Sequence, residues 1–217
     1  MKENGFEYVD LGLPSGTMWA TCNVGASKPE DEGLLFQFGR VDGYRCGDKN
    51  NKFRTNKQNK QDTLDEYIPK TTSGKVYTYG EILDLADDAA HVHMGGKWKM
   101  PTKDELKELL NNTTHKVEII NGVKGMLFTS NTNDNQLFIP FMKSFWYNGI
   151  WYSLVESYAF MWFSQVHTSY IDGAYRLYCD LGAVLTLNTS IERLLILCVE
   201  YLKNKAFRSI LMMIYIL

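Results

Sequence analysis

The sequence lacks most of the patterns that mark a metalloprotein, a redox protein or a nucleic-acid-binding protein. Its four cysteines (Cys22, Cys46, Cys179 and Cys198) show no C-x-x-C spacing, so neither a metal knuckle nor a redox pair is indicated. Four free thiols are expected, with two disulfides as the alternative. A formal net charge of −2 provides no long-range field for nucleic acid, and no basic stripe interrupts the chain.

Long apolar runs are missing as well. The longest, Leu194–Val199 and Ile210–Leu217, are far shorter than the roughly 20 residues that a membrane helix needs, so no membrane insertion is expected. Met1–Ser15 has no basic region followed by an apolar stretch, so no signal peptide is expected. Export would then need another route or a larger parent polypeptide, and composition leaves the cellular location open.

What the sequence does contain is typical of a folded domain with a recognition surface. The 217 residues are 45% hydrophobic and 22% charged, which is enough to bury a substantial core. Aromatic residues make up 13%, and 13 of the 29 lie between Phe141 and Tyr178. Large rigid rings are common in binding surfaces, so this clustering indicates recognition by the second half of the chain.

The first half of the chain predicts short strands followed by two helices. Phe6–Gly39 has the pattern of strands and turns, and the polar segment Asp48–Lys60 that of a solvated loop. Thr102 is a predicted N-cap, Glu105 completes a capping box, and the helix that follows has one apolar side. That side consists of Leu106, Leu109 and Leu110. A second, weaker helix is predicted over Tyr79–His91.

The second half predicts antiparallel strands. Val117–Ile120 and Met126–Thr129 flank Asn121-Gly122, which is a hairpin signal. Further strands are predicted at Leu137–Ile139, Tyr158–Phe163, Ala174–Cys179 and Ala183–Leu187. Two helices followed by an antiparallel meander, with irregular loops and no internal repeat, indicate an α+β domain.

Four stretches of the chain resemble a known family. Tyr8–Asp31 looks like the opening of the Fibrobacter succinogenes major paralogous domain family, and Asp87–Leu110 resembles its central segment. Asn121–Ser130 and Leu137–Pro140 resemble the stretch that follows. Together these matches cover about residues 6 to 190, and their order along the chain makes the resemblance specific.

The resemblance implies a C-type-lectin-like fold, which is also similar to the formylglycine-generating enzyme. The family is abundant in Bacteroides and related gut bacteria and in their phages. Some relatives are the variable proteins of diversity-generating retroelements, whose C-terminal half is rewritten to change the ligand. By resemblance, the N-terminal half is a scaffold and the C-terminal half a binding face. The implied role is that of an adhesin or phage receptor-binding module, at a cell surface or on a virion, with a surface protein or glycan as partner.

The end of the chain departs from the family pattern. Members close with a strand resembling Gly-Phe-Ser-Val-Arg, where this sequence has Glu192–Tyr201. We therefore expect a ligand-binding domain over residues 1–200 and an atypical tail over 201–217. One hypothesis is a reading-frame change near Arg193, because a shifted reading of codons for Phe-Ser-Val can yield Ile-Leu-Cys.

The predicted ligand face combines aromatic rings with small polar side chains, which supply adaptable hydrogen bonds. Its members are Trp146, Tyr147, Asn148, Trp151, Tyr152, His167, Ser169, Tyr170, Asp172 and Tyr175. The alternative is that many of these rings belong to the core. Tyr158–Phe163 is apolar on both strand faces, so Trp162 is expected to be buried.

Neither a metal nor another cofactor is expected. His91 and His93 flank one residue, but spacing gives no third ligand, so capping or packing is the favoured role. Asp84, Asp87 and Asp88 lack the ordered alternation of a calcium loop, and a solvated helix face is the favoured reading.

Catalysis has little support in the sequence. Chemistry of the formylglycine-generating type needs an activated cysteine pair in the C-terminal half, and neither Cys179 nor Cys198 has a basic neighbour in sequence. Binding rather than catalysis is therefore the prediction. The alternatives are an enzyme of that type and a degenerate copy without function.

Overall fold

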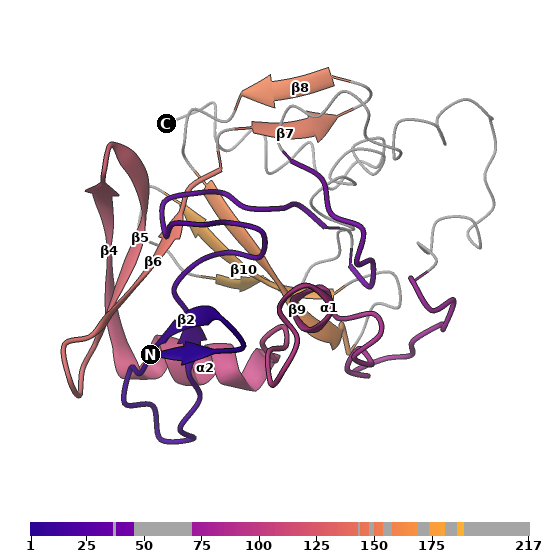
Figure 1. Ribbon diagram of the computed structural model, residues 1–217, viewed down its shortest axis with the longest axis horizontal. Helices are drawn as coiled ribbons and strands as arrows, with labels where there is room; N and C mark the ends of the chain where they lie inside the picture. Colours follow the sequence, from indigo (N-terminus) through magenta and orange to yellow (C-terminus); the bar gives the residue numbers. More distant parts are fainter. Residues whose placement is uncertain are drawn as a thin grey trace.

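The protein is described by a computed structural model that covers residues 1–36, 38–45, 71–142, 144–147, 150–153, 158–168, 174–180 and 186–188. Within these residues it is an α+β structure with antiparallel sheets, which confirms the predicted class (Figure 1). The helices are α1 (Ala89–Met94) and α2 (Lys103–Asn112). The strands are β1 (Lys2–Glu3), β2 (Phe6–Val9), β3 (Trp19–Ala20), β4 (Thr113–Ile120), β5 (Val123–Ser130), β6 (Gln136–Pro140), β7 (Ser144–Tyr147), β8 (Ile150–Ser153), β9 (Tyr158–Val166), β10 (Ala174–Asp180) and β11 (Thr186–Asn188).

The helix α2 begins where the capping box predicted it. The Thr102 hydroxyl accepts from the Glu105 N–H at 3.3 Å, and the Glu105 carboxylate accepts from the Thr102 N–H at 2.7 Å. These two bonds satisfy donors that a helix N-terminus otherwise leaves open. Leu106 and Leu109 are fully buried and Leu110 is half-buried, so the predicted apolar side is the one that packs.

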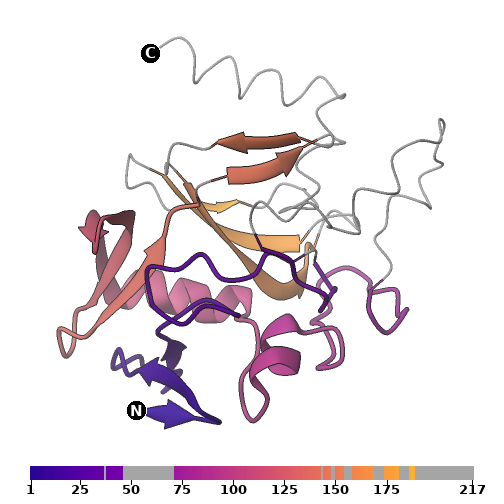
Figure 2. The same ribbon diagram turned by 45° about the horizontal axis from the view of Figure 1, so that its top comes forward.

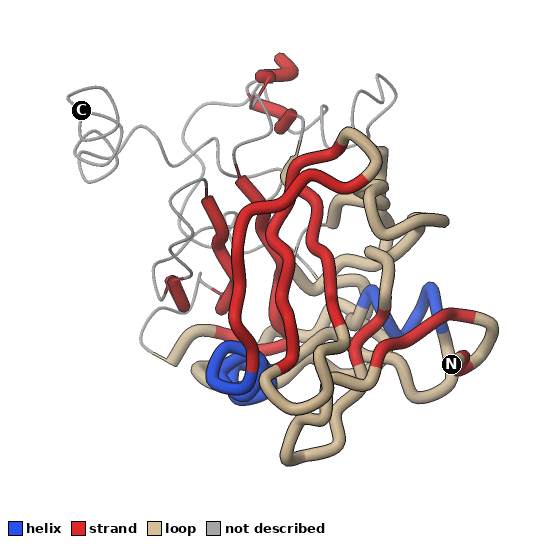
Figure 3. The backbone as a smooth tube through the Cα atoms, turned by 90° about the vertical axis from the view of Figure 1, so that its left-hand side faces the viewer, coloured by secondary structure: helices blue, strands red, loops and turns tan. Residues whose placement is uncertain are grey.

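The predicted hairpin is also confirmed, as β4 and β5 joined by Asn121-Gly122. Asn121 and Gly122 have φ of 50° and 82°, the positive values that a type I′ turn needs. Strand β6 then pairs with β5 to complete the three-stranded sheet seen face-on in Figure 3. A Cβ at Gly125 would lie 2.5 Å from the Ile139 carbonyl oxygen, so glycine is required for this close approach.

A second sheet, in the order β11-β10-β9, lies beside the first, and α2 packs against one end of both (Figure 1). Phe163 of β9 and Leu177 of β10 are fully buried and belong to one core with the leucines of α2 and with Phe128 of β5. Trp162 is buried as predicted, and its indole N–H donates to the Phe36 carbonyl at 3.0 Å.

The predicted helix over Tyr79–His91 is wrong, because α1 spans only Ala89–Met94. Residues 81–83 instead run along the edge of β9, where the Leu83 N–H donates to the Ser164 carbonyl and the Val166 N–H to the Glu81 carbonyl. Pairing with a sheet therefore overrides the helical spacing of the apolar residues. The strand expected within Leu34–Phe38 is reduced to a single bridge between Leu35 and Tyr44.

Several other predictions fall outside the described residues. They concern the polar segment Asp48–Lys60 and the residues 189–217, which include Arg193 and the atypical tail. In the part of the chain that is described, no helix has the length and apolar character needed to cross a membrane.

Replacing Thr102 with Ala should lower the free energy of unfolding by about 1 kcal/mol, because the capping bond to the Glu105 N–H is lost. The change is measured by urea unfolding followed by circular dichroism. Thr102→Ser keeps the hydroxyl and should stay within about 0.5 kcal/mol of the native protein. An unchanged midpoint for Thr102→Ala would show that the cap does not stabilise α2.

Candidate functional site

The centre of the predicted ligand face forms a hairpin of its own. Strands β7 and β8 pair antiparallel in register, with Trp146 opposite Trp151 and residue 145 opposite Tyr152. Tyr147 pairs with residue 150. Within the described residues this two-stranded sheet is not hydrogen-bonded to the other sheets. Figures 1 and 2 both place it at the end of the molecule opposite α2 and the N-terminus.

The other members of the predicted face divide into two groups. Asn148, Ser169, Tyr170 and Asp172 lie outside the described residues. His167 and Tyr175 are described, and both are buried, with 3% and 1% of their surface exposed.

His167 and Tyr175 form an interior cluster at the start of α2. Their rings lie 4.8 Å apart, and the Tyr175 hydroxyl is 2.8 Å from the Thr168 hydroxyl and 3.1 Å from the Lys103 ammonium. The prediction that these two rings lie on an accessible face is therefore corrected. Their aromatic surface is used to join β9, β10 and α2.

The Lys103 ammonium contributes to the pKa shifts of both Tyr175 and His167. Burial acts to raise the pKa of the Tyr175 phenol, but hydrogen bonds from Thr168 and Lys103 outweigh it and hold that pKa below its ordinary value. Burial and the nearby Lys103 ammonium both lower the pKa of His167 and so favour its neutral ring.

A cavity of about 520 Å³, open to solvent, is formed mainly by residues of the N-terminal half of the chain. Its wall is drawn from β2 and β3, residues 22–24 and 32–36, α1 and the segment after it, β6, and residues 161–162. Three of the five tryptophans and five of the nine methionines line it. They are Trp19, Trp98, Trp162, Met18, Met94, Met100, Met142, Met161.

Hydrogen bonds fix part of this wall. The indole N–H of Trp98 donates to the Glu3 carbonyl at 2.9 Å, and that of Trp162 donates to the Phe36 carbonyl at 3.0 Å. The indole N–H of Trp19 is buried and has no hydrogen-bond partner among the residues the structure describes. Leaving a buried donor unsatisfied costs about 1–3 kcal/mol, so the position of the Trp19 ring is maintained by packing in the core rather than by a hydrogen bond.

Sequence reasoning missed this cavity, although a signal for it exists. Tryptophan and methionine occur together at three places along the chain, Met18-Trp19, Trp98 to Met100, and Met161-Trp162. All six residues line the cavity. The sequence around each pair does not indicate that these three pairs, which are far apart in the chain, line one cavity.

Two of the three aspartates are buried and none lies within a helix, which corrects the prediction of a solvated helix face, while Asp84 is exposed. Asp87 has no exposed surface and Asp88 has 2%. The Asp87 carboxylate accepts from the N–H and hydroxyl of Ser73, both at 2.6 Å, and from the Tyr77 hydroxyl at 2.7 Å. The Asp88 carboxylate accepts from the N–H groups of His91 and Met100, each at 2.9 Å. These carboxylates therefore tie loops together.

The histidines are likewise engaged by the backbone. His91 Nδ1 lies 3.1 Å from the Trp98 carbonyl oxygen, and His93 Nε2 lies 2.8 Å from the Val41 carbonyl oxygen. The two rings thus contact different segments. No cluster of three or more metal-ligating side chains occurs among the residues covered by the structure.

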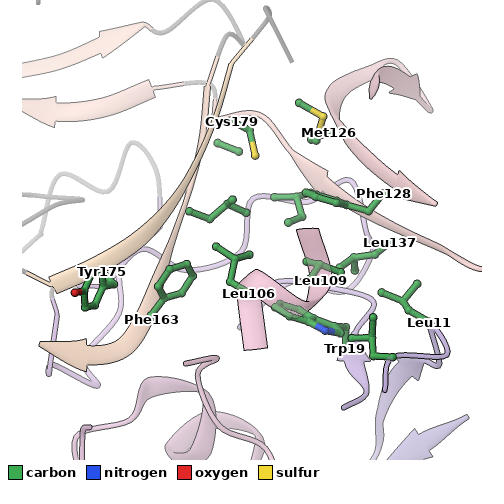
Figure 4. Close-up of a cluster of buried hydrophobic side chains, with 14 of the residues drawn as sticks. Leu11, Trp19, Leu106, Leu109, Met126, Phe128, Leu137, Phe163, Tyr175 and Cys179 are labelled. Atoms are coloured by element: carbon green, nitrogen blue, oxygen red, sulfur yellow. The ribbon is translucent and has the colours of Figure 1, made fainter. Parts of the chain in front are cut away.

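The described thiols are poorly placed for nucleophilic chemistry. Burial raises the pKa of Cys22, which is half-buried, while Cys179 is fully buried in the core between the sheets (Figure 4). A reactive thiol needs a lowered pKa and access to solvent. Cys46 and Cys198 lie outside the described residues.

Replacing Asp87 with Asn should destabilise the fold by about 2 kcal/mol near neutral pH, because the charge-assisted bonds from Ser73 and Tyr77 are weakened. Burial acts to raise the pKa of Asp87, but these bonds outweigh it and hold the pKa below its ordinary value. A carboxylate with a depressed folded-state pKa contributes stability at higher pH, and this is lost as pH falls through that pKa.

The difference in unfolding free energy between native protein and Asp87→Asn should therefore shrink as pH falls below about 4. Urea unfolding at a series of pH values measures it. Asp84→Asn is the matched control, since Asp84 forms only an exposed pair with Lys75 and should change stability by less than about 0.5 kcal/mol. A difference that does not change with pH would refute the assignment of charge to Asp87.

Comparisons of the chain with protein-family models, with curated proteins and with solved structures find no match. The resemblance of residues 6 to 190 to the major paralogous domain family thus stays a prediction from the sequence. What the hairpin and the cavity do is inferred from their own residues and geometry.

Proposed function

We propose that this chain is a ligand-recognition domain with a C-type-lectin-like arrangement. In it, a packed scaffold holds an aromatic hairpin for contact with a cell-surface protein or glycan. The observation that carries the proposal is the register of β7 and β8, which brings Trp146 opposite Trp151 and places Tyr152 on the neighbouring rung. Tryptophan and tyrosine provide most of the binding energy in many protein interfaces.

The attachment of the hairpin supports this function. Phe141 is fully buried and Met142 is 5% exposed, and β7 begins two residues after Met142. The Phe141 N–H donates to the Lys124 carbonyl at 2.8 Å, which fixes the entry of the hairpin to β5. A recognition element held by a rigid core loses less conformational entropy on binding than a free loop does.

Binding is favoured over thiol chemistry of the formylglycine-generating type by the environment of Cys179, the described member of the cysteine pair in the C-terminal half. Its full burial in the core opposes a reactive thiolate. The adhesin or phage receptor-binding role, the diversified C-terminal half and the single domain over residues 1–200 are parts of the same proposal.

Replacing Trp151 with Ser should weaken attachment of the full chain to intact gut bacterial cells by about 30-fold. Loss of a central tryptophan costs about 2 kcal/mol in many interfaces. The measurement is equilibrium binding of the fluorescently labelled protein to a panel of cells. Ile119→Ser is the control, because Ile119 is 61% exposed on β4, in a different sheet. Equal binding by Trp151→Ser and the native protein would refute the role of the hairpin.

Deep sequencing of codons 141 to 205 in a clonal population should find substitutions concentrated at aromatic, Asn and Ser positions, with constant flanks. That pattern would support a diversified ligand face. A uniform sequence would contradict diversification and leave a fixed binding domain or a decayed copy. The same reads test for a break in the frame near Arg193.

A further inference from the structure

We infer that the cavity in the scaffold half is a second binding site, which takes an uncharged aromatic small molecule. Its wall comes from residues of the chain between Glu3 and Glu105, with β6, Met142, Met161 and Trp162 closing it. None of these residues belongs to β7 or β8. The inference therefore stands whatever the hairpin binds.

The size of the cavity suits a small molecule. Its volume of about 520 Å³ lies within the range of roughly 300–1,000 Å³ found for ligand pockets. Met18, which is 40% exposed, and the exposed Lys97 and Lys99 all line the cavity, so part of its wall reaches solvent. Trp162, Met94 and Met142 are buried and line the interior. A route from solvent to an apolar interior is thus present.

The chemistry of the wall favours an aromatic ligand over an aliphatic one. Thioether sulfurs gain about 0.3–1.5 kcal/mol from contact with an aromatic ring, and paired rings gain about 0.5–1.5 kcal/mol beyond the burial of their area. With three tryptophans and five methionines in the wall, an aromatic guest makes both kinds of contact. An alkyl chain of equal area gains only from burial.

The charges of the wall favour a neutral ligand. Its ionisable side chains are of both signs, with carboxylates from Glu3, Glu32 and Glu105 and ammonium groups from Lys97 and Lys99. Lys99 Nζ is already 2.7 Å from the Glu105 carboxylate. With Glu105 paired to Lys99, the groups Glu3, Glu32 and Lys97 leave a net charge of −1, which repels an anion, and burying any ion without a close partner is costly.

Part of the wall is preorganised for a ligand. Two of its three indole rings are held by backbone carbonyls, those of Glu3 and Phe36. The methionines around them are unbranched and adjust to the outline of the guest. This combination lets a ring-shaped molecule bind with little ordering cost.

The test is a titration of the full chain with N-phenyl-1-naphthylamine, a neutral aromatic probe that fluoresces in apolar surroundings. Saturable binding is expected. Ala20→Trp should fill part of the cavity, and Met18→Asp should place a charge at its opening. Each should weaken probe binding at least 10-fold. The matched controls are Ile119→Trp and Leu85→Asp, whose positions are exposed and do not line the cavity. They should bind the probe as the native protein does.

Near-UV circular dichroism establishes that each variant is folded, and Met18→Asp, at an exposed position, is the substitution least able to disturb folding. Native-like binding by both folded cavity variants would overturn the proposed site. So would loss of probe binding in Trp151→Ser with full binding in Met18→Asp, because the probe would then sit on the hairpin. Conversely, loss of cell attachment in Trp151→Ser without loss of probe binding keeps the two sites separate.

Competition for the bound probe tests the ligand class. Displacement should be strongest with 1-naphthol, weaker with 1-decanol and weakest with 1-naphthalenesulfonate. Displacement by 1-decanol at a lower concentration than 1-naphthol would overturn the aromatic preference. Equal displacement by the sulfonate and by 1-naphthol would overturn the preference for a neutral molecule.

Discussion

Leu106 and Leu109 on α2 have no contact with water, and their burial joins the helix to the core shared by the two larger sheets. The helix leads directly into β4 and also contacts β9 and β10, so it joins the two larger sheets of the fold. Fully burying a leucine contributes about 1.5–3 kcal/mol, and a helix of 10 residues would be marginal without it. The capping box, the turn into β4 and the core of Figure 4 all depend on this contact.

From that helix the first sheet and then the hairpin proposed for recognition follow along the chain. Strands β4 to β6 return the chain past α2, and the buried Phe141 ends that passage directly before β7. The aromatic hairpin is thus attached through a buried residue of the core, while the cavity lies where β2, β3 and α1 meet β6 and residues 161–162. Two sites of different chemistry can in this way share one core without sharing residues.

Local signals predicted the parts of this fold that local contacts stabilise. Thr102 and Glu105 are three residues apart, and Asn121-Gly122 forms its turn from its own backbone, so both were readable in the sequence. The burial of Asp87 was not readable, because its partner Ser73 lies 14 residues away in an irregular segment. The cavity was even harder to predict, because its wall includes Trp98, which is fixed by a backbone carbonyl 95 residues earlier in the chain. Of the predicted face, aromatic clustering marked the region of β7 and β8 but predicted a loop there rather than strands, and it could not foresee the burial of Tyr175.

The short pairing of residues 81–83 with β9 has a consequence for many copies of this protein held close together. Strand β9 is the last strand of its sheet, and its free backbone groups would otherwise be open to a strand from another molecule. The bonds at Ser164 and Val166 occupy part of that edge with the chain's own backbone. When many copies lie close together, an uncovered edge strand can pair with a strand of another molecule. Here a segment of only a few residues covers part of the edge of β9 and opposes such pairing.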